Sequence, residues 1–255
     1  MRMLARALPV TAALALVCGA TVPAVAEVTP PLRVAAASDL AGALEAVGLA
    51  YGRETGQKIV FSFGSSGLLA KQLREGAPFD LFLSADARFV DDTIASGACD
   101  GRERAVYARG RLVLLARGAA PPSLRALGEA RWRRVAIANP DHAPYGRAAV
   151  AALRAAGVYD AVGPRLVYAD SVLRAVQFVS SGNADVGLVA RSLVGKIPAE
   201  SWVLVDAALH PPIEQTLAVC GRDVERRMAA AAFARWLRGP DGRKILTAFG
   251  FEEPR

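Results

Sequence analysis

The strongest constraint on the fold is a regular alternation of short apolar runs with longer segments of helical periodicity, which begins at Leu32 and continues almost to the end of the chain. The predicted strands are 32–36, 59–63, 81–84, 112–116, 135–138, 166–168, 186–189, 202–205 and 216–220. The predicted helices include 41–55, 68–75, 147–156, 171–181 and 224–237. Alternation of this kind is typical of α/β architecture with mostly parallel sheets.

Two apolar strands, 111–116 and 215–220, bracket the middle of the chain. We interpret them as the two crossings of a hinge between two lobes, each a mixed, mostly parallel sheet flanked by helices. The first lobe is predicted to hold residues 32–110 and 221–255, and the second lobe residues 111–220. In open α/β sheets ligands bind outside the carboxyl ends of the strands, so a ligand is expected between the lobes.

The first 26 residues have the pattern of a secretory signal peptide. Arg2 and Arg6 precede an apolar stretch at 8–17, and Ala24-Val25-Ala26 is a small-residue cleavage site. Cys18 raises a lipoprotein alternative, which fits less well because a small residue is preferred where Val17 stands. No later apolar run has the length needed to span a bilayer. The sequence therefore predicts an exported protein that reaches the periplasm without a lipid anchor.

Neither the net charge nor the cysteines identify a binding partner. The full chain has a net charge of +7, and 31 of its residues are Lys or Arg, of which only four are lysines. The densest basic cluster, 131–134, precedes an apolar strand and is read as a solvated helix end, so nucleic-acid binding is not expected. Cys99 and Cys220 remain after cleavage, and in an oxidising compartment they form either a disulfide or two buried thiols.

Four times in the chain a strand passes into a helix through a short polar or glycine-containing turn. The turns contain Ser38-Asp39, Ser65-Ser66, the segment 139–146 and Ser171-Val172. Each single serine is most simply a helix cap. Four helix starts that face one cleft, however, would each supply unpaired N–H groups and about half a positive charge. Together they predict a site for a doubly negative anion, held by hydrogen-bond donors without a buried cation.

The enzyme interpretations are weaker. A hydrolase that used Ser65 with His142 would need a residue that orients the histidine, and Gly64-Ser65-Ser66-Gly67 is not the G-x-S-x-G elbow. No P-loop motif is present in the sequence. Asp141, His142 and His210 do not have metal-ligand spacing, so no metal ion or cofactor is expected.

Five segments carry a resemblance to a known family: VAAASDL (34–40), FGSSG (63–67), APFDLFLSAD (77–86), NPDHAPYG (139–146) and GNADVGLVA (182–190). With them, essentially all of the chain after the signal peptide resembles the periplasmic molybdate-binding proteins, the substrate-binding components of molybdate ABC importers. The resemblance implies a type II periplasmic binding protein fold, whose two lobes close on the ligand. It also implies a monomer without catalytic activity or cofactor, which passes molybdate or tungstate to an inner-membrane ABC permease.

The resemblance further implies the residues that hold the anion. Ser38 and Ser65 are expected to donate their hydroxyl and backbone N–H groups. Tyr145 and Val172 are expected to donate backbone N–H groups from helix starts, and Tyr145 also its hydroxyl. The backbone N–H of Asp39 is a further expected donor.

Two positions leave the choice of anion open. Some family members have a tyrosine where this chain has Ala190. The carboxylate of Asp39 would repel a dianion, so its side chain is expected to turn away from the site. If it faced the anion, phosphate would become a candidate, because hydrogen phosphate has a proton to donate. Sulfate remains the other alternative.

Overall fold

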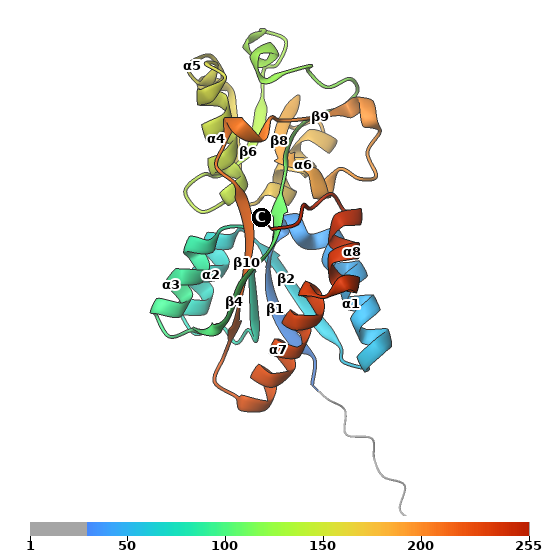
Figure 1. Ribbon diagram of the computed structural model, residues 1–255. Helices are drawn as coiled ribbons and strands as arrows, with labels where there is room; N and C mark the ends of the chain where they lie inside the picture. Colours follow the sequence, from blue (N-terminus) through green and yellow to red (C-terminus); the bar gives the residue numbers. More distant parts are fainter. Residues whose placement is uncertain (1–29, 255) are drawn as a thin grey trace, which may run out of the picture.

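In the computed structural model, which describes residues 30–254, the chain forms two five-stranded sheets with helices packed against them. Figure 1 shows the sheets one above the other, as two lobes joined by strands that run between them. The predicted two-lobed α/β fold is confirmed. The predicted signal peptide lies outside the described residues, and no helix within them is long and apolar enough to cross a membrane.

The first sheet, in the lower lobe of Figure 1, has the strand order β2-β1-β3-β10-β4. Its strands are β1 (Leu32–Ala37), β2 (Ile59–Gly64), β3 (Leu81–Ser84), β4 (Cys99–Gly110) and β10 (Ile213–Cys220). β1 pairs in parallel with β2 and β3, whereas β10 runs antiparallel to β3 and β4. The central strands β1 and β3 are buried on both faces, which is why they read as unbroken apolar runs.

Five helices cover this sheet: α1 (Ala41–Thr55), α2 (Ser66–Arg74), α3 (Ala87–Ala95), α7 (Val224–Arg238) and α8 (Pro240–Ala248). Their ends follow local rules. Asp86 and Asp223 cap the starts of α3 and α7 by accepting backbone N–H bonds. Gly56 ends α1 in the left-handed conformation, with φ at 74°.

The second sheet has the order β7-β6-β8-β5-β9. Its strands are β5 (Leu112–Ala116), β6 (Val135–Ala138), β7 (Leu166–Ala169), β8 (Val186–Ala190) and β9 (Trp202–Leu204), and its helices are α4 (Pro144–Ala155), α5 (Tyr159–Val162) and α6 (Val172–Ser180). β6 pairs in parallel with β7 and β8, while β5 runs antiparallel to β8 and β9. This lobe has the same arrangement as the first: a parallel centre with an antiparallel side.

The two crossings between the lobes differ in part from the prediction. The first lies at Arg111, between β4 of the first sheet and β5 of the second. The second precedes Ile213, because β10 pairs with β3 and β4 of the first sheet. The predicted lobe boundary at residue 220 is therefore corrected: residues 213–220 belong with the first sheet. β4, which the apolar pattern did not predict, is the edge strand beside β10.

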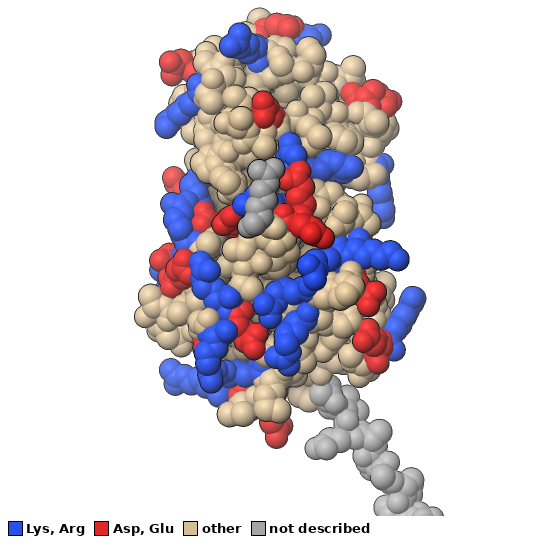
Figure 2. All heavy atoms as spheres, in the orientation of Figure 1, with Lys and Arg blue, Asp and Glu red and all other residues tan. Residues whose placement is uncertain are grey.

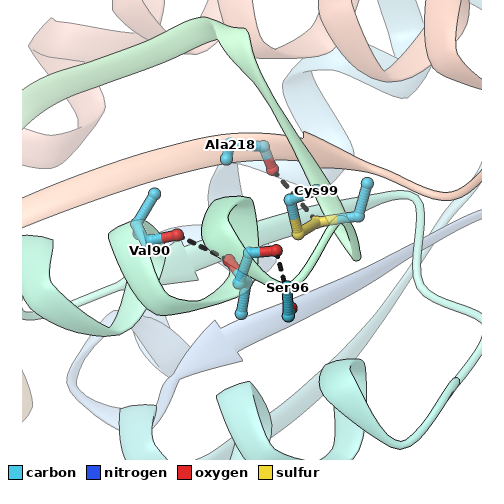
Figure 3. The surroundings of a disulfide bond; sticks show 6 residues. Val90, Ser96, Cys99 and Ala218 are labelled. Carbon is cyan, nitrogen blue, oxygen red and sulfur yellow. Dashed lines mark hydrogen bonds between the residues drawn. A yellow bond between two sulfur atoms is a disulfide. The ribbon is translucent and has the colours of Figure 1, made fainter.

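A disulfide joins Cys99, the first residue of β4, to Cys220, the last residue of β10. The two cysteines face each other in the antiparallel register of the strands. Figure 3 shows the bond next to the end of α3, where Ser96 lies, and beside Ala218 of β10. Of the two alternatives for these cysteines, the structure has the disulfide.

The excess of basic side chains does not form a continuous positive surface on the face drawn in Figure 2. Lys and Arg side chains gather over the lower lobe there, but acidic side chains lie among them. Several make ion pairs, among them Arg102 with Asp100 and Arg104 with Asp91.

Candidate functional site

The four polar turns meet around one small cavity between the two lobes. Ser38 and Asp39 contribute from the turn after β1, and Ser65 from the turn after β2. Tyr145 contributes from the first turn of α4, and Val172 from the start of α6. All five residues predicted to bind the anion therefore line the same cavity.

The sheet register explains why these turns meet. β1 and β2 run parallel with Ala37 opposite Gly64, so the turns that follow them leave the sheet side by side. In the second lobe Ala138 of β6 lies opposite Ala169 of β7, and the turn after β6 is tied to β7 by the bond from the Asn139 N–H to the Ala169 carbonyl. Each pair of turns thus occupies the carboxyl edge of its sheet, and these edges face each other across the cavity.

The structure separates serines that cap a helix from serines that are free for other partners. Ser171 caps α6, because its hydroxyl accepts the Arg174 N–H at 3.3 Å. In the described part of the chain the side chains of Ser38 and Ser65 do not cap the helices that follow them, although both are buried at a helix start. The Ser38 hydroxyl accepts the Leu173 N–H, in the first turn of α6 in the second lobe, at 3.4 Å. Capping of the following helix therefore holds for Ser171 and fails for Ser38 and Ser65.

The hydroxyl of Ser65 instead contacts the second lobe. Its Oγ lies 2.8 Å from Nδ1 of His142, the pair that a hydrolase would need. Among residues 30–254, however, no hydrogen bond to Nε2 orients the imidazole. The pair therefore lacks the third group of a catalytic triad, and it serves as a contact between the lobes.

Tyr145 is buried, and its hydroxyl lies on the hinge side of the cavity. A Cβ atom added to Gly110, the last residue of β4, would lie only 2.1 Å from this oxygen. The hydroxyl also lies beside the carboxyl of Asp39, and no described group makes a well-aligned hydrogen bond to it. The position requires glycine at 110, because any side chain there would displace the tyrosine.

Asp39 is 1% exposed, and its side chain reaches the first sheet, where Nε2 of Gln215 on β10 donates to Oδ2 at 2.6 Å. Burial raises the pKa of this carboxyl to about 7, and the neighbouring Tyr145 hydroxyl, its own backbone N–H and Gln215 offset only part of that effect.

Further contacts hold the lobes together around the cavity. The Gly67 N–H of α2 donates to the His142 carbonyl at 2.9 Å. Arg147 of α4 pairs with Asp86 of the first lobe at 2.5 Å and lies over the ring of Phe89 on α3. These bonds would all break if the lobes separated, so the structure is a closed form.

Gly67→Ala should weaken ligand binding by about 5- to 150-fold. A Cβ atom there would lie 2.8 Å from the carbonyl oxygen of His142 and 2.9 Å from the ring of Phe89. This overpacking should destabilise the closed form by about 1–3 kcal/mol. Alanine is a better helix former than glycine, so α2 itself should not suffer. Calorimetric titration checks this, with Gly52→Ala as control, because a Cβ at Gly52 meets only an ordinary contact at 3.4 Å. Unchanged affinity in Gly67→Ala would contradict the closed geometry.

Several residues near the site were not predicted. Ser66 is fully buried and accepts the Ala85 N–H at 3.0 Å, which fixes the turn after β2. Ser192 of the second lobe donates to the Asp39 carbonyl at 2.7 Å. For Gln215 the sequence held one indication of a special role, because it is a polar residue within an apolar strand. Ala190 is buried at the end of β8 and is not among the residues that line the cavity. No group of metal ligands occurs in the described residues.

Comparison with known proteins agrees with this geometry. Residues 32–252 match the family model described as "Bacterial extracellular solute-binding protein". The chain is 35% identical to the molybdate-binding protein ModA of Rhodobacter capsulatus over 94% of both chains, and 33% identical to ModA of Azotobacter vinelandii over 91% of this chain and 94% of that protein. The solved Azotobacter vinelandii periplasmic molybdate-binding protein superposes with a TM-score of 0.82 at 32% identity, covering 88% of this chain and all of that one. The chain therefore belongs to the bacterial extracellular solute-binding proteins, a family of non-enzymatic transport components, and within it to the group of the molybdate-binding proteins.

Proposed function

We propose that this protein captures molybdate or tungstate in the periplasm and delivers it, as a monomer, to an inner-membrane ABC permease. The observation that carries the proposal is the convergence of four strand-to-helix turns on one cavity, where the hydroxyls of Ser38 and Ser65 do not cap the helices that follow them but contact the opposite lobe. The names of the similar proteins, which are molybdate-binding proteins, support the same ligand.

The physical basis is an anion site built from neutral groups. The starts of α2, α4 and α6 each present N–H groups without a partner inside their helix, together with about half a positive charge. The hydroxyls of Ser38 and Ser65 and the N–H groups of Tyr145 and Val172 are the proposed donors. Charge-assisted hydrogen bonds of this kind stabilise an oxyanion without a buried Lys or Arg.

Delivery requires that the ligand favours closure. A ligand shifts an open–closed equilibrium only if it binds the closed form better. The cavity meets this condition because each lobe contributes two of the four turns. We propose residues 30–110 with 213–254 as one moving lobe and residues 111–212 as the other, with the two crossings as the hinge.

Sulfate and phosphate are the competing ligands. The Asp39 side chain reaches toward β10 rather than standing free in the cavity, which favours a fully deprotonated anion over hydrogen phosphate. Titration of the protein without residues 1–26 with molybdate, tungstate, sulfate and phosphate tests the proposal. Molybdate or tungstate should bind most tightly, and a preference for phosphate or sulfate would refute the proposed ligand.

Ser38→Ala and Ser65→Ala should each weaken molybdate binding by about 1.5–3 kcal/mol, or roughly 10- to 150-fold, because each removes a charge-assisted hydrogen bond. Ser181→Ala is the matched control, since Ser181 lies exposed at the opposite end of α6. Isothermal titration calorimetry measures all three variants. Wild-type affinity in both site variants would remove these hydroxyls from the site.

A further inference from the structure

A cluster of buried polar atoms that lack partners lies beside the anion cavity. Within residues 30–254, no hydrogen bond is made by Oδ1 of Asp39, by the hydroxyls of Tyr107 and Tyr145, or by Oε1 of Gln215. All four side chains are buried, and Asp39 lines the cavity itself. Buried polar atoms nearly always have a hydrogen-bond partner. Four unpaired atoms around one carboxyl therefore indicate that an additional hydrogen atom is needed to complete their hydrogen bonds.

The cluster joins both lobes and both strands that lead to the crossings. Gln215 is on β10 and Tyr107 is on β4, whereas Tyr145 comes from the second lobe. Tyr107 is the extra residue of a β-bulge, because Thr216 pairs with Val106 and Gln215 with Ala108. A bulge redirects the side chain that it carries, here toward the interior, where burial first and the charge of Asp39 second raise the pKa of Tyr107.

No described cation neutralises the Asp39 carboxyl. The titratable groups that face it are Tyr107 and Tyr145, and burial beside Asp39 raises the pKa of both. The charged residues on the helices packed around the turn are engaged elsewhere: Arg174 of α6 bonds Gln177, Arg191 lies over Trp202, and Glu45 of α1 is exposed. An ionised Asp39 would therefore be an unpaired buried charge next to a bound dianion.

We propose that Asp39 is a specificity-determining positioning residue which carries a proton whenever the lobes close on the anion, so that capture of the dianion takes up one proton. The proposal rests on the proposed function and deepens it. A neutral carboxyl fits its surroundings: Oδ2 accepts from Gln215, and a hydrogen on Oδ1 can be donated to the hydroxyl of Tyr145. The proton comes from solvent, and no bond other than that O–H is formed.

The direction of the pH dependence follows from linkage. In an open form the second lobe, which carries Tyr145, moves away and water reaches Asp39, so the pKa of the Asp39 carboxyl returns toward the ordinary 3.8. In the closed form burial raises this pKa to about 7. A bound dianion raises it further. The closed form thus holds more protons than the open form between these values. Affinity should be high at the acidic end of this window and fall, by up to about tenfold per pH unit, as the pH rises through it.

Asp39→Asn provides the test, because asparagine is a permanently neutral analogue that can accept from Gln215 and donate to Tyr145. Molybdate affinity is measured by calorimetry from about pH 5.5 to 8.5 in buffers of different ionisation enthalpy, which also gives the protons taken up per anion. His142 contacts Ser65 in the same site, so its contribution has to be separated from that of Asp39. Both proteins are therefore also compared in a His142→Gln background, where the pair differs only at Asp39.

The expected result is that affinity falls with rising pH in the proteins with Asp39, with uptake approaching one proton per anion, and that both effects shrink strongly in Asp39→Asn. Parallel pH profiles and equal proton uptake in the matched pair would overturn the inference while leaving anion capture intact. Phosphate bound more tightly than molybdate, with affinity rising with pH, would show an ionised carboxylate that accepts a hydrogen and would also overturn it. Failure of all four anions to bind at any pH would instead refute the proposed function, and the inference with it.

Discussion

Replacement of both Cys99 and Cys220 by serine should lower the free energy of unfolding by about 2–5 kcal/mol. The two residues are 121 positions apart, so the bond closes a long loop and removes much of the conformational freedom of the unfolded chain. Chain-entropy arguments give about 4.7 kcal/mol for a loop of about 100 residues. For a chain of this size the melting temperature should fall by roughly 5–20 °C. Urea denaturation and thermal unfolding measure both quantities.

The control is the effect of a reductant. Dithiothreitol should destabilise the wild-type protein by a similar amount and leave the double serine variant unchanged. Anion affinity under native conditions should be retained, because the bond joins the ends of β4 and β10 that lie away from the crossings at Arg111 and Ile213. A wild-type unfolding midpoint that does not respond to reductant would show that the bond contributes nothing to stability.

Gly146→Ala should abolish measurable anion binding and destabilise the second lobe by about 3 kcal/mol or more. A Cβ atom on Gly146 would lie 2.1 Å from the carbonyl oxygen of Ala138, at the end of β6, and 2.9 Å from the backbone nitrogen of Pro140. These are backbone atoms that cannot rotate away, so the start of α4 must shift. The shift would move the Tyr145 N–H out of the site and separate Arg147 from Asp86.

Gly128→Ala is the matched control in the same lobe. Gly128 is the last residue of a short 3-10 helix, its φ is not in the left-handed region, and an added Cβ would meet nothing within 4 Å. This variant should bind the anion normally and be as stable as the wild type or slightly more stable. Calorimetry and thermal unfolding of the two variants compare them directly. If Gly146→Ala bound the anion as Gly128→Ala does, α4 could not be fixed against β6 in the way the structure shows.

The predicted anion residues met in one cavity because their positions depend on local patterns. Ser38 and Ser65 follow the neighbouring strands β1 and β2, which pair in parallel, and parallel neighbours end at the same edge of a sheet. Once the strand, turn and helix are recognised, the place of each turn follows from α/β architecture. The contacts made by the serines could not be predicted in this way, since capping and free hydroxyls have the same sequence signature.

The strands with weaker patterns were predicted less well. β4 is an edge strand whose middle, from Arg102 to Arg104, is charged and mostly exposed, so it has no apolar run. β10 was recognised as a strand, but its apolar residues do not indicate which sheet it joins. That choice depends on pairing with β3 and β4, which are far away in the sequence.

By itself the sequence determined the α/β alternation, the strand-to-helix turns and the family, because these follow from local periodicity, turn chemistry and motifs close together in the chain. Tertiary structure alone decided the sheet to which β10 belongs, the pairing of Cys99 with Cys220, the contact between Ser65 and His142, and the enclosure of Asp39 by Gln215 and Tyr145. Each of these features depends on groups from distant segments and on the exclusion of water between them. Neither the meeting of distant groups nor the exclusion of water is encoded in any local stretch of residues.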